Sequence, residues 1–200
     1  MGGSARRAAE ARVRANSLRG SAGPHGVTLT RRLAAAIRDV RDFPREGIVF
    51  KDLTPALRDS RLFPELVEAL ADPWASAGIA RVAGVEARGF LLAGAIAGHL
   101  SCGLVPLRKP GKLPWRCHRV VYDLEYGTDV LEAHEDAFES GDRVLIVDDV
   151  LATGGTARAA SQLVRACGAN VTGAAFLVEL GFLGGRHKLE GLDVRAILTL

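Results

Sequence analysis

The chain has 200 residues, 48% of them hydrophobic, and a formal net charge of +3. This length favours a single domain with a sizeable core, and so mild a charge does not favour nucleic-acid binding. Its three cysteines, Cys102, Cys117 and Cys167, lack the C-x-x-C spacing of metal sites, which favours a reduced, cytoplasmic protein. The longest apolar run, residues 89–100, is too short to span a bilayer, so we expect no membrane partner.

The first 27 residues differ in composition from the rest of the chain. They are rich in Ala, Arg, Gly and Ser, contain no aromatic residue, and lack the apolar core of a signal peptide. Their arginines would suit an organelle transit peptide, but the Leu/Phe face of an amphipathic targeting helix is missing. We predict a disordered Ala/Arg-rich tail over 1–27 and a folded domain over 28–200, and an over-long start of the reading frame is the alternative.

The folded part is predicted to begin with two helices separated by a short extended segment. Thr30 can cap a helix whose apolar side runs from Leu33 to Val40. A proline and a glycine then break regular structure before a short extended piece over 48–50. Ser60 and Pro64 are predicted to start the next helix, which has apolar residues as far as Trp74.

A strand over 80–85 ends in Glu86-Ala87-Arg88-Gly89-Phe90 and leads into a helix rich in Ala, Gly and Leu. Loops at the carboxyl ends of strands are where open α/β sheets bind ligands. The planar guanidinium of Arg88 could bind pyrophosphate oxygens there. A surface ion pair between Arg88 and Glu86 is the alternative.

The next short buried strand, 103–107, runs into Arg108-Lys109-Pro110-Gly111-Lys112-Leu113-Pro114. Three cations with Pro and Gly indicate a mobile basic loop that can close over a polyphosphate, although charge runs are usually solvated surface. Residues 119–126 then alternate in polarity, Gly127 turns the chain, and residues 130–133 return it. This pattern predicts a two-stranded flap, which is marginal alone and can open and close over a substrate.

The most informative stretch is 144–156. Four apolar residues, Val144 to Val147, read as a strand buried on both faces, as in a parallel sheet. Asp148 and Asp149 follow, and as acceptor-only groups they suit sugar hydroxyls or a metal. The small-residue loop then leads into a helix: it consists of Ala152, Thr153, Gly154, Gly155 and Thr156. Its backbone N–H groups and the helix dipole can bind a phosphate, so the stretch predicts a site for ribose 5-phosphate.

This stretch resembles the phosphoribosyl pyrophosphate (PRPP) signature of the type I phosphoribosyltransferases. Four further segments resemble the adenine phosphoribosyltransferases of that family, in family order: 42–52, 86–90, 108–114 and 124–127. The resemblance covers residues 28–200 and implies an α/β fold with a mostly parallel central sheet flanked by helices. It also implies a β-hairpin flap and a small hood, formed by the N-terminal segment and the C-terminal strand.

The resemblance implies an enzyme of purine salvage and AMP biosynthesis that joins adenine to PRPP, giving AMP and pyrophosphate. It implies Mg²⁺ as cofactor, bound mainly through PRPP with no protein ligand assigned, and a homodimer. A phosphoribosyltransferase for another base and a regulator that binds PRPP without catalysis are the alternatives. The resemblance leaves open whether Arg108 acts on its own active site or on its neighbour's.

Several residue roles follow from the resemblance alone. The backbone around Val49 and Lys51 would face adenine, Leu180 would pack against the base, and Phe50 would either stack on it or fill the core. Arg88, Arg108 and Lys112 would bind pyrophosphate, whereas no role is assigned to Lys109. Family members often have Arg at the position of Lys51 and Pro at that of Glu46, and neither change affects recognition by the backbone.

The general acid/base is assigned by a further comparison. The 6-oxopurine phosphoribosyltransferases place an Asp inside the phosphate loop, where this chain has Ala152. A proton acceptor for the purine must therefore come from elsewhere. Glu125, which lies with Tyr126 in the family's Leu-Glu-Tyr-Gly at the flap tip, is the predicted catalytic residue, and Asp123 is the fallback.

Overall fold

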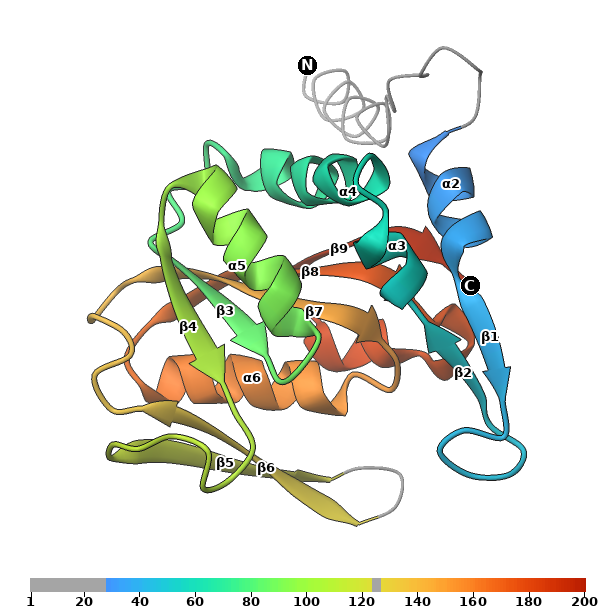
Figure 1. Cartoon of the computed structure of the whole chain (residues 1–200). Helices are drawn as coiled ribbons and strands as arrows, with labels where there is room; N and C mark the ends of the chain where they lie inside the picture. Colours follow the sequence, from blue (N-terminus) through green and yellow to red (C-terminus); the bar gives the residue numbers. More distant parts are fainter. Residues whose placement is uncertain (1–27, 124–126) are drawn as a thin grey trace, which may run out of the picture.

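The computed structural model describes residues 28–123 and 127–200. A five-stranded parallel sheet lies at its centre, with the strand order β4-β3-β7-β8-β9 (Figure 1). The strands are β3 (Arg81–Val85), β4 (Gly103–Leu107), β7 (Arg143–Leu151), β8 (Asn170–Glu179) and β9 (Asp193–Thr199). The predicted parallel sheet is therefore confirmed.

The central strand β7 shows why the apolar run 144–147 is uninterrupted. Leu145 and Val147 pack into the core on one face of the sheet, whereas Val144 and Ile146 pack into the core on the other face. All four side chains are fully buried. A strand covered on both faces requires apolar residues at successive positions, which is the usual pattern of parallel sheets.

Helices cover both faces of the sheet (Figure 1). One face carries α2 (Leu29–Ala36), α3 (Thr54–Arg58), α4 (Leu62–Ala71) and α5 (Gly89–Leu100). The other face carries α6 (Gly155–Ala166) and the antiparallel hairpin of β5 (Cys117–Asp123) and β6 (Thr128–His134). Short 3-10 helices span Asp72–Trp74, Gly181–Leu183 and Gly185–Leu189. No helix in the described ranges is long and apolar enough to cross a membrane.

A separate two-stranded ribbon, β1 (Arg38–Arg41) with β2 (Val49–Asp52), lies at one side of the molecule (Figure 1). The helix predicted to extend from Thr30 to Val40 is therefore too long. Its cap is Thr28, whose hydroxyl accepts the N–H of Arg31 at 3.4 Å, and the helix ends at Ala36. Val40 lies in β1 opposite Phe50, because pairing with a distant strand overrides the local apolar pattern.

Two other expectations differ from the structure. The C-terminal strand, expected in the hood, is β9 and pairs in parallel with β8 at the sheet edge. The helix expected to start at Ser60 begins at Leu62, and the Asp59 carboxylate accepts the Leu62 N–H at 3.0 Å. The predicted two-stranded hairpin is confirmed as β5 and β6, and its Tyr122 and Leu131 are buried in the core on the α6 side of the sheet. Part of the hairpin predicted as a mobile flap therefore packs in the hydrophobic core.

Candidate active site

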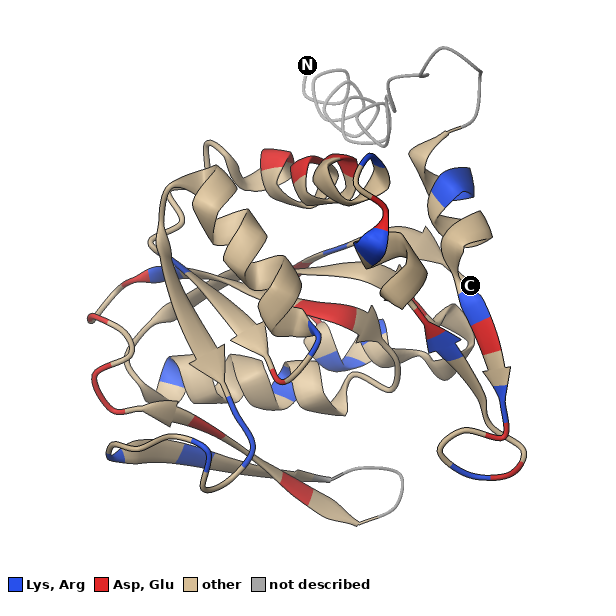
Figure 2. Cartoon of the chain, in the orientation of Figure 1, with Lys and Arg blue, Asp and Glu red and all other residues tan. Residues whose placement is uncertain are grey.

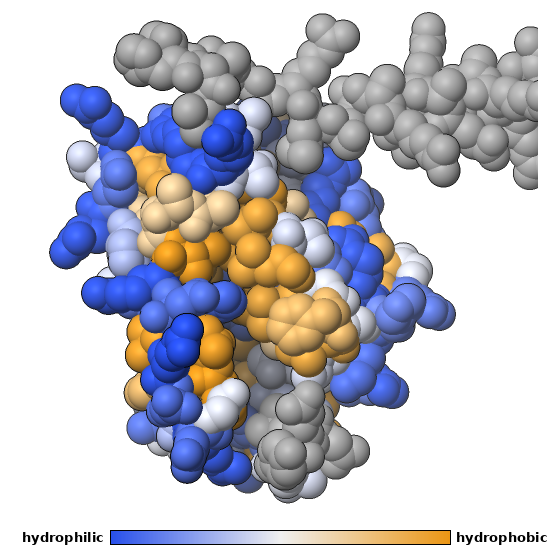
Figure 3. Space-filling view, turned by 90° about the vertical axis from the view of Figure 1, so that its right-hand side faces the viewer, coloured by the Kyte–Doolittle hydropathy of each residue, from blue (hydrophilic) through white to orange (hydrophobic). Residues whose placement is uncertain are grey.

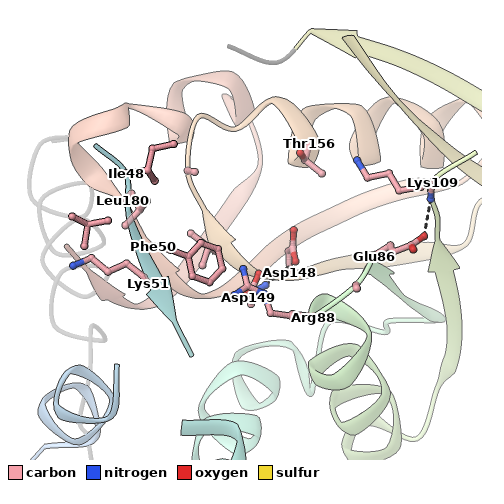
Figure 4. A pocket seen from close by; sticks show the side chains of 14 residues that line it. Ile48, Phe50, Lys51, Glu86, Arg88, Lys109, Asp148, Asp149, Thr156 and Leu180 are labelled. Carbon is pink, nitrogen blue, oxygen red and sulfur yellow. Dashed lines mark hydrogen bonds and ion pairs between the residues drawn. The ribbon is translucent and has the colours of Figure 1, made fainter. Parts of the chain in front are cut away.

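The site lies in a cavity of about 440 Å³ at the carboxyl ends of β3 and β7, beside the ribbon. Its lining combines three stretches that are distant in the sequence, 48–51, 86–88 and 148–156, the last through Asp148, Asp149, Val150, Ala152 and Thr156, together with Lys109 and Leu180. Figure 4 shows Phe50, Lys51 and Leu180 at one end, Glu86 and Lys109 at the other, and the two aspartates between them. The parallel sheet and the ribbon thus bring the predicted base, ribose and phosphate segments to one cavity.

Asp148 and Asp149 occupy the middle of this cavity. They lie in the C-terminal part of β7, and Asp149 is only 4% exposed. Burial and the neighbouring carboxylate of Asp149 raise the pKa of Asp148 well above its usual value. Burial also raises the pKa of Asp149, although the guanidinium of Arg88 opposes that shift. In Figure 2 this acidic stretch lies in the interior, whereas most other charged segments lie at the periphery.

Arg88, in the loop between β3 and α5, points into the cavity. Its Nε lies 2.7 Å from Asp149 Oδ2, and its guanidinium lies over the ring of Phe50, 4.9 Å from the ring centroid. The alternative of a surface ion pair with Glu86 is therefore wrong. The position of Arg88 between a carboxylate and an aromatic ring leaves guanidinium N–H groups available to an anionic ligand.

The phosphate loop, residues 152–156, joins β7 to α6. Gly154 has φ +76° and caps the helix, so a residue without Cβ is required at this position. Ala152 and Thr156 line the cavity, whereas Thr153, Gly154 and Gly155 form the turn between them. The first N–H groups of a 12-residue helix point toward this end of the cavity, which suits a phosphate.

The basic loop, residues 108–114, is anchored by two carboxylates. Glu86 accepts the backbone N–H of Lys109 at 2.8 Å and lies 3.3 Å from Arg108 Nε. Burial alone would raise the pKa of Glu86, but these two donors lower it below its usual value. The buried Glu132 accepts the N–H of Gly111 at 3.1 Å. The start of the loop is therefore fixed to the sheet and the hairpin.

Of the three cations in the basic loop, the one that lines the cavity is Lys109, to which the sequence assigns no role. Its ammonium group is paired with Asp129 and donates to the hydroxyl of Tyr122 at 3.1 Å. The side chain of Arg108 instead donates to the carbonyl of Lys112 at 3.1 Å, and neither of these two residues lines the cavity. The loop sequence contains three cations and gives no signal of which one faces inward.

At the other end of the cavity, the ribbon contributes Val49, Phe50 and Lys51, and β8 contributes Leu180 just beyond its end. Phe50 packs edge-on against Phe43, with ring centroids 5.1 Å apart. Lys51 pairs with Asp39 at 2.7 Å across the ribbon. Glu125 and Tyr126 lie outside the described residues.

The cavity lining contains the carboxylates of Glu86, Asp148 and Asp149. The described ranges contain no group of three or more His, Cys, Asp or Glu side chains that could hold a metal ion. Asp149 Oδ2 is buried and lies 2.7 Å from Arg88 Nε, so an ion would compete with that ion pair for this oxygen. The residues present therefore fit an ion held mainly by a substrate's own oxygens.

Comparisons with known proteins agree with this geometry. Residues 70–191 match the family model described as "Phosphoribosyl transferase domain". The chain is 56% identical, over 168 residues, to the adenine phosphoribosyltransferase of Parafrankia sp. (strain EAN1pec), covering 84% of this chain and 91% of that protein.

Solved structures are similar as well. The adenine phosphoribosyltransferase of Rhodothermus marinus DSM 4252 is 50% identical with a TM-score of 0.83, covering 86% of this chain and 98% of that one. The Saccharomyces cerevisiae enzyme was solved in complex with adenine and an imino-altritol bisphosphate. It is 40% identical with a TM-score of 0.80, over 85% of this chain and 98% of that one.

Proposed function

This chain belongs to the adenine phosphoribosyltransferases, and we propose that successive parts of its cavity bind the base, the ribose 5-phosphate and the pyrophosphate in the reaction of this family. The enzyme transfers the 5-phosphoribosyl group from PRPP to adenine, giving AMP and pyrophosphate, a purine-salvage reaction. The observation that carries the proposal is the order of the lining: base segment, acidic pair and cations along one cavity. We assign residues 28–200 to this catalytic domain.

The edge of the ribbon reads the base. Within the described residues β2 pairs with β1 alone, so its other edge has unpaired backbone groups. Val49 and Lys51 are two residues apart, so their backbone groups point to the same edge. A carbonyl there accepts from the adenine 6-amino group and an N–H donates to N1. A 6-oxopurine presents the reverse pattern and is rejected.

Phe50 and Leu180 hold the faces of the base. Phe50 is half-buried, lines the cavity and has an arginine over its ring, which favours stacking over a purely structural role. Leu180, just beyond the end of β8, lines the same end of the cavity. Apolar contacts of this kind orient a planar ring without choosing between purines, so discrimination rests on the backbone of β2.

The middle of the cavity holds the ribose 5-phosphate. The phosphate loop and the start of α6 bind the 5′-phosphate through backbone N–H groups and the hydroxyls of Thr153 and Thr156. Asp148 and Asp149 accept from the ribose hydroxyls, and their charge favours the oxocarbenium-like ring that forms as pyrophosphate departs. Binding energy from the remote phosphate therefore aligns the reacting carbon.

Pyrophosphate is bound by cations at the far end. Arg88 exchanges its contact with Asp149 for pyrophosphate oxygens, and Lys109 adds a second charge from the anchored part of the basic loop. Arg108 and Lys112 complete the set when their mutual contact opens. Mg²⁺ bound to PRPP would supply further neutralisation of the leaving group, and Asp148 and Asp149 are carboxylates of the lining that would contribute oxygens to it.

Glu125 is proposed as the general acid/base that handles the purine proton, with Tyr126 beside it in the flap. The test is the E125Q variant, with E135Q at an exposed position of the chain as the control. We expect wild-type and E135Q protein to release pyrophosphate from PRPP and Mg²⁺ when adenine is added. E125Q should lose roughly 100-fold or more in kcat while still binding PRPP. Full activity of E125Q would overturn the assignment.

We also propose a cytoplasmic homodimer. The support is that α5, apolar apart from His99, exposes Leu91, and that Leu104 and Trp115 are exposed nearby in sequence on β4 and the following loop. All three cysteines are unpaired, as in a reducing compartment. Sedimentation equilibrium tests the dimer, and a monomer at micromolar concentration would contradict it.

A further inference from the structure

The outer wall of the phosphate loop is made by a second glycine pair, Gly184 and Gly185. Gly185 is buried, and a Cβ built on it would collide with the carbonyl oxygen of Ala152 and lie 2.8 Å from the nitrogen of Gly154. A Cβ on Gly154 would in turn lie 2.9 Å from the carbonyl carbon of Gly185. Backbone therefore packs directly on backbone, and the position of one turn determines the position of the other.

The next residue, Arg186, ties this wall to the sheet. Its Nε and Nη2 donate to the two carboxylate oxygens of Glu179 at the end of β8, at 3.0 and 2.5 Å, and its Nη1 donates to the carbonyl of Val194 in β9 at 2.6 Å. Glu179 is only 7% exposed. A two-pronged guanidinium–carboxylate contact fixes direction as well as distance, which a single hydrogen bond does not.

We propose that Arg186, held by Glu179, is a positioning residue for PRPP: it holds Gly184 and Gly185 against the phosphate loop and so fixes the N–H groups that bind the 5′-phosphate. The inference rests on the proposed function of that loop. Neither Arg186 nor Glu179 lines the cavity, so both act through the backbone of Gly185 and Gly154. The expected signature is a defect in PRPP binding.

The adenine end should be spared because other contacts hold it. The N–H of Leu180 donates to Leu151 at 2.8 Å, and that of Gly181 donates to Leu200 at 2.9 Å. The N–H of Leu200 donates to Glu179 at 2.9 Å. These are backbone bonds between neighbouring strands and do not involve the guanidinium of Arg186. Loss of Arg186 should therefore affect PRPP and adenine unequally.

The experiment compares R186Q with R195Q. Arg195 also pairs with an acidic residue, Asp193 at 2.9 Å, but it is half-exposed, lies over the ring of Trp74 and does not line the cavity. We expect R186Q to raise the KM for PRPP about tenfold, because a small displacement of the phosphate loop weakens binding of the 5′-phosphate. The KM for adenine should rise less than about twofold. R195Q should leave both values unchanged.

A purely structural role is separated from positioning by the double variant E179Q/R186Q. The single variant leaves a buried carboxylate without its partner and should lower the melting temperature. The double variant removes both charges and should recover much of that stability, yet keep the raised KM for PRPP. Calorimetric titration with ribose 5-phosphate should show the same loss of affinity in both variants.

The outcomes are distinguishable. If wild-type protein neither releases pyrophosphate with adenine nor binds ribose 5-phosphate, the proposed function fails and the inference falls with it. If wild-type protein is active and the variants show equal changes in the two KM values, or unchanged affinity for ribose 5-phosphate, the inference alone is overturned. Should R186Q be insoluble, R186K provides the same test, because Lys retains the charge but not the two-pronged contact; its KM for PRPP should rise by an intermediate factor.

Discussion

The two ends of the cavity are built in opposite ways. The phosphate end continues β7, the middle strand of the five-stranded sheet, and is walled by buried backbone. The base end lies on a two-stranded ribbon whose Val49 is 48% exposed and whose neighbours Ile48 and Phe43 are exposed too. Figure 3 shows apolar side chains gathered at the surface on the ribbon's side of the molecule. The phosphoribosyl donor is thus bound by the core, and the base is bound by an edge.

This difference predicts that changes at the phosphate end will be costly and changes at the base end mild. Core positions are fixed by packing from several elements, whereas a ribbon edge can vary without disturbing the sheet. Recognition of the base through backbone groups makes the base end still less dependent on its side chains.

The largest effect is expected from G154A. Gly154 adopts a left-handed conformation and its Cβ would meet the backbone of Gly185, so the alanine must displace the loop. We expect kcat/KM for PRPP to fall roughly 100-fold and the free energy of unfolding to fall by roughly 1–3 kcal/mol. Steady-state kinetics and urea unfolding measure the two losses. A variant with wild-type kinetics would show that the phosphate end is not fixed by packing.

D148N is expected to separate function from stability. Its amide can still accept the N–H of Asp149, now made to Oδ1 at 2.9 Å, but it cannot hold the ribose as an anion, so activity should fall strongly. Because the pKa of Asp148 is raised in the folded protein, ionisation of this group destabilises the fold as pH rises above the unfolded value. The variant should therefore be more stable at pH 7, by about 1 kcal/mol.

The pH dependence supplies the check on D148N. The stability gain should shrink as pH falls toward about 4, where the unfolded aspartate is itself protonated. Urea unfolding of both proteins at pH 7 and at lower pH measures this difference. A variant less stable than wild type at pH 7 would contradict a raised pKa of Asp148 in the folded protein.

F50L tests the base end at its half-buried aromatic side chain. Leucine keeps apolar volume but loses the aromatic face that stacks on adenine and that carries the guanidinium of Arg88. We expect the KM for adenine to rise roughly tenfold with a smaller change for PRPP. Initial-rate kinetics with each substrate varied in turn measures both values, and equal changes would show that Phe50 acts through Arg88 instead.

V49A should have the smallest effect. The side chain is half-exposed, and the proposed role of this residue belongs to its backbone, which alanine retains. We expect the KM for adenine to change by less than about twofold. A tenfold rise would place recognition in the side chain and would remove the argument that the ribbon edge reads the base.

The phosphate end could be predicted from the sequence because its signals are local. Four apolar residues, two acids and a pair of glycines follow one another between 144 and 156, and each restricts the structure of its neighbours. The predicted strand 144–147 lies within β7, although β7 continues through both aspartates to Leu151 because it pairs with β8 along that length. Parallel sheets place such strand ends together without further information.

The rest depends on contacts between distant segments. Val40 was assigned to a helix because its spacing from Leu33 is helical, yet pairing with Phe50 places it in a strand. The direction of Lys109 is set by Asp129 and Tyr122 on the hairpin, and the role of Gly185 by the loop it touches. A single sequence shows none of these partners, and a Gly-Gly pair outside a strand–helix turn gave no signal of its function.

The most direct test of the account is a base panel under one set of conditions. Purified enzyme, PRPP and Mg²⁺ are mixed with adenine, hypoxanthine, guanine, xanthine, orotate or uracil, and pyrophosphate release is followed. The account predicts release with adenine alone, because the unpaired backbone of β2 complements N1 and the 6-amino group and opposes a 6-oxo group. Comparable release with hypoxanthine or guanine would contradict it, since the ribbon edge would then not be reading the base.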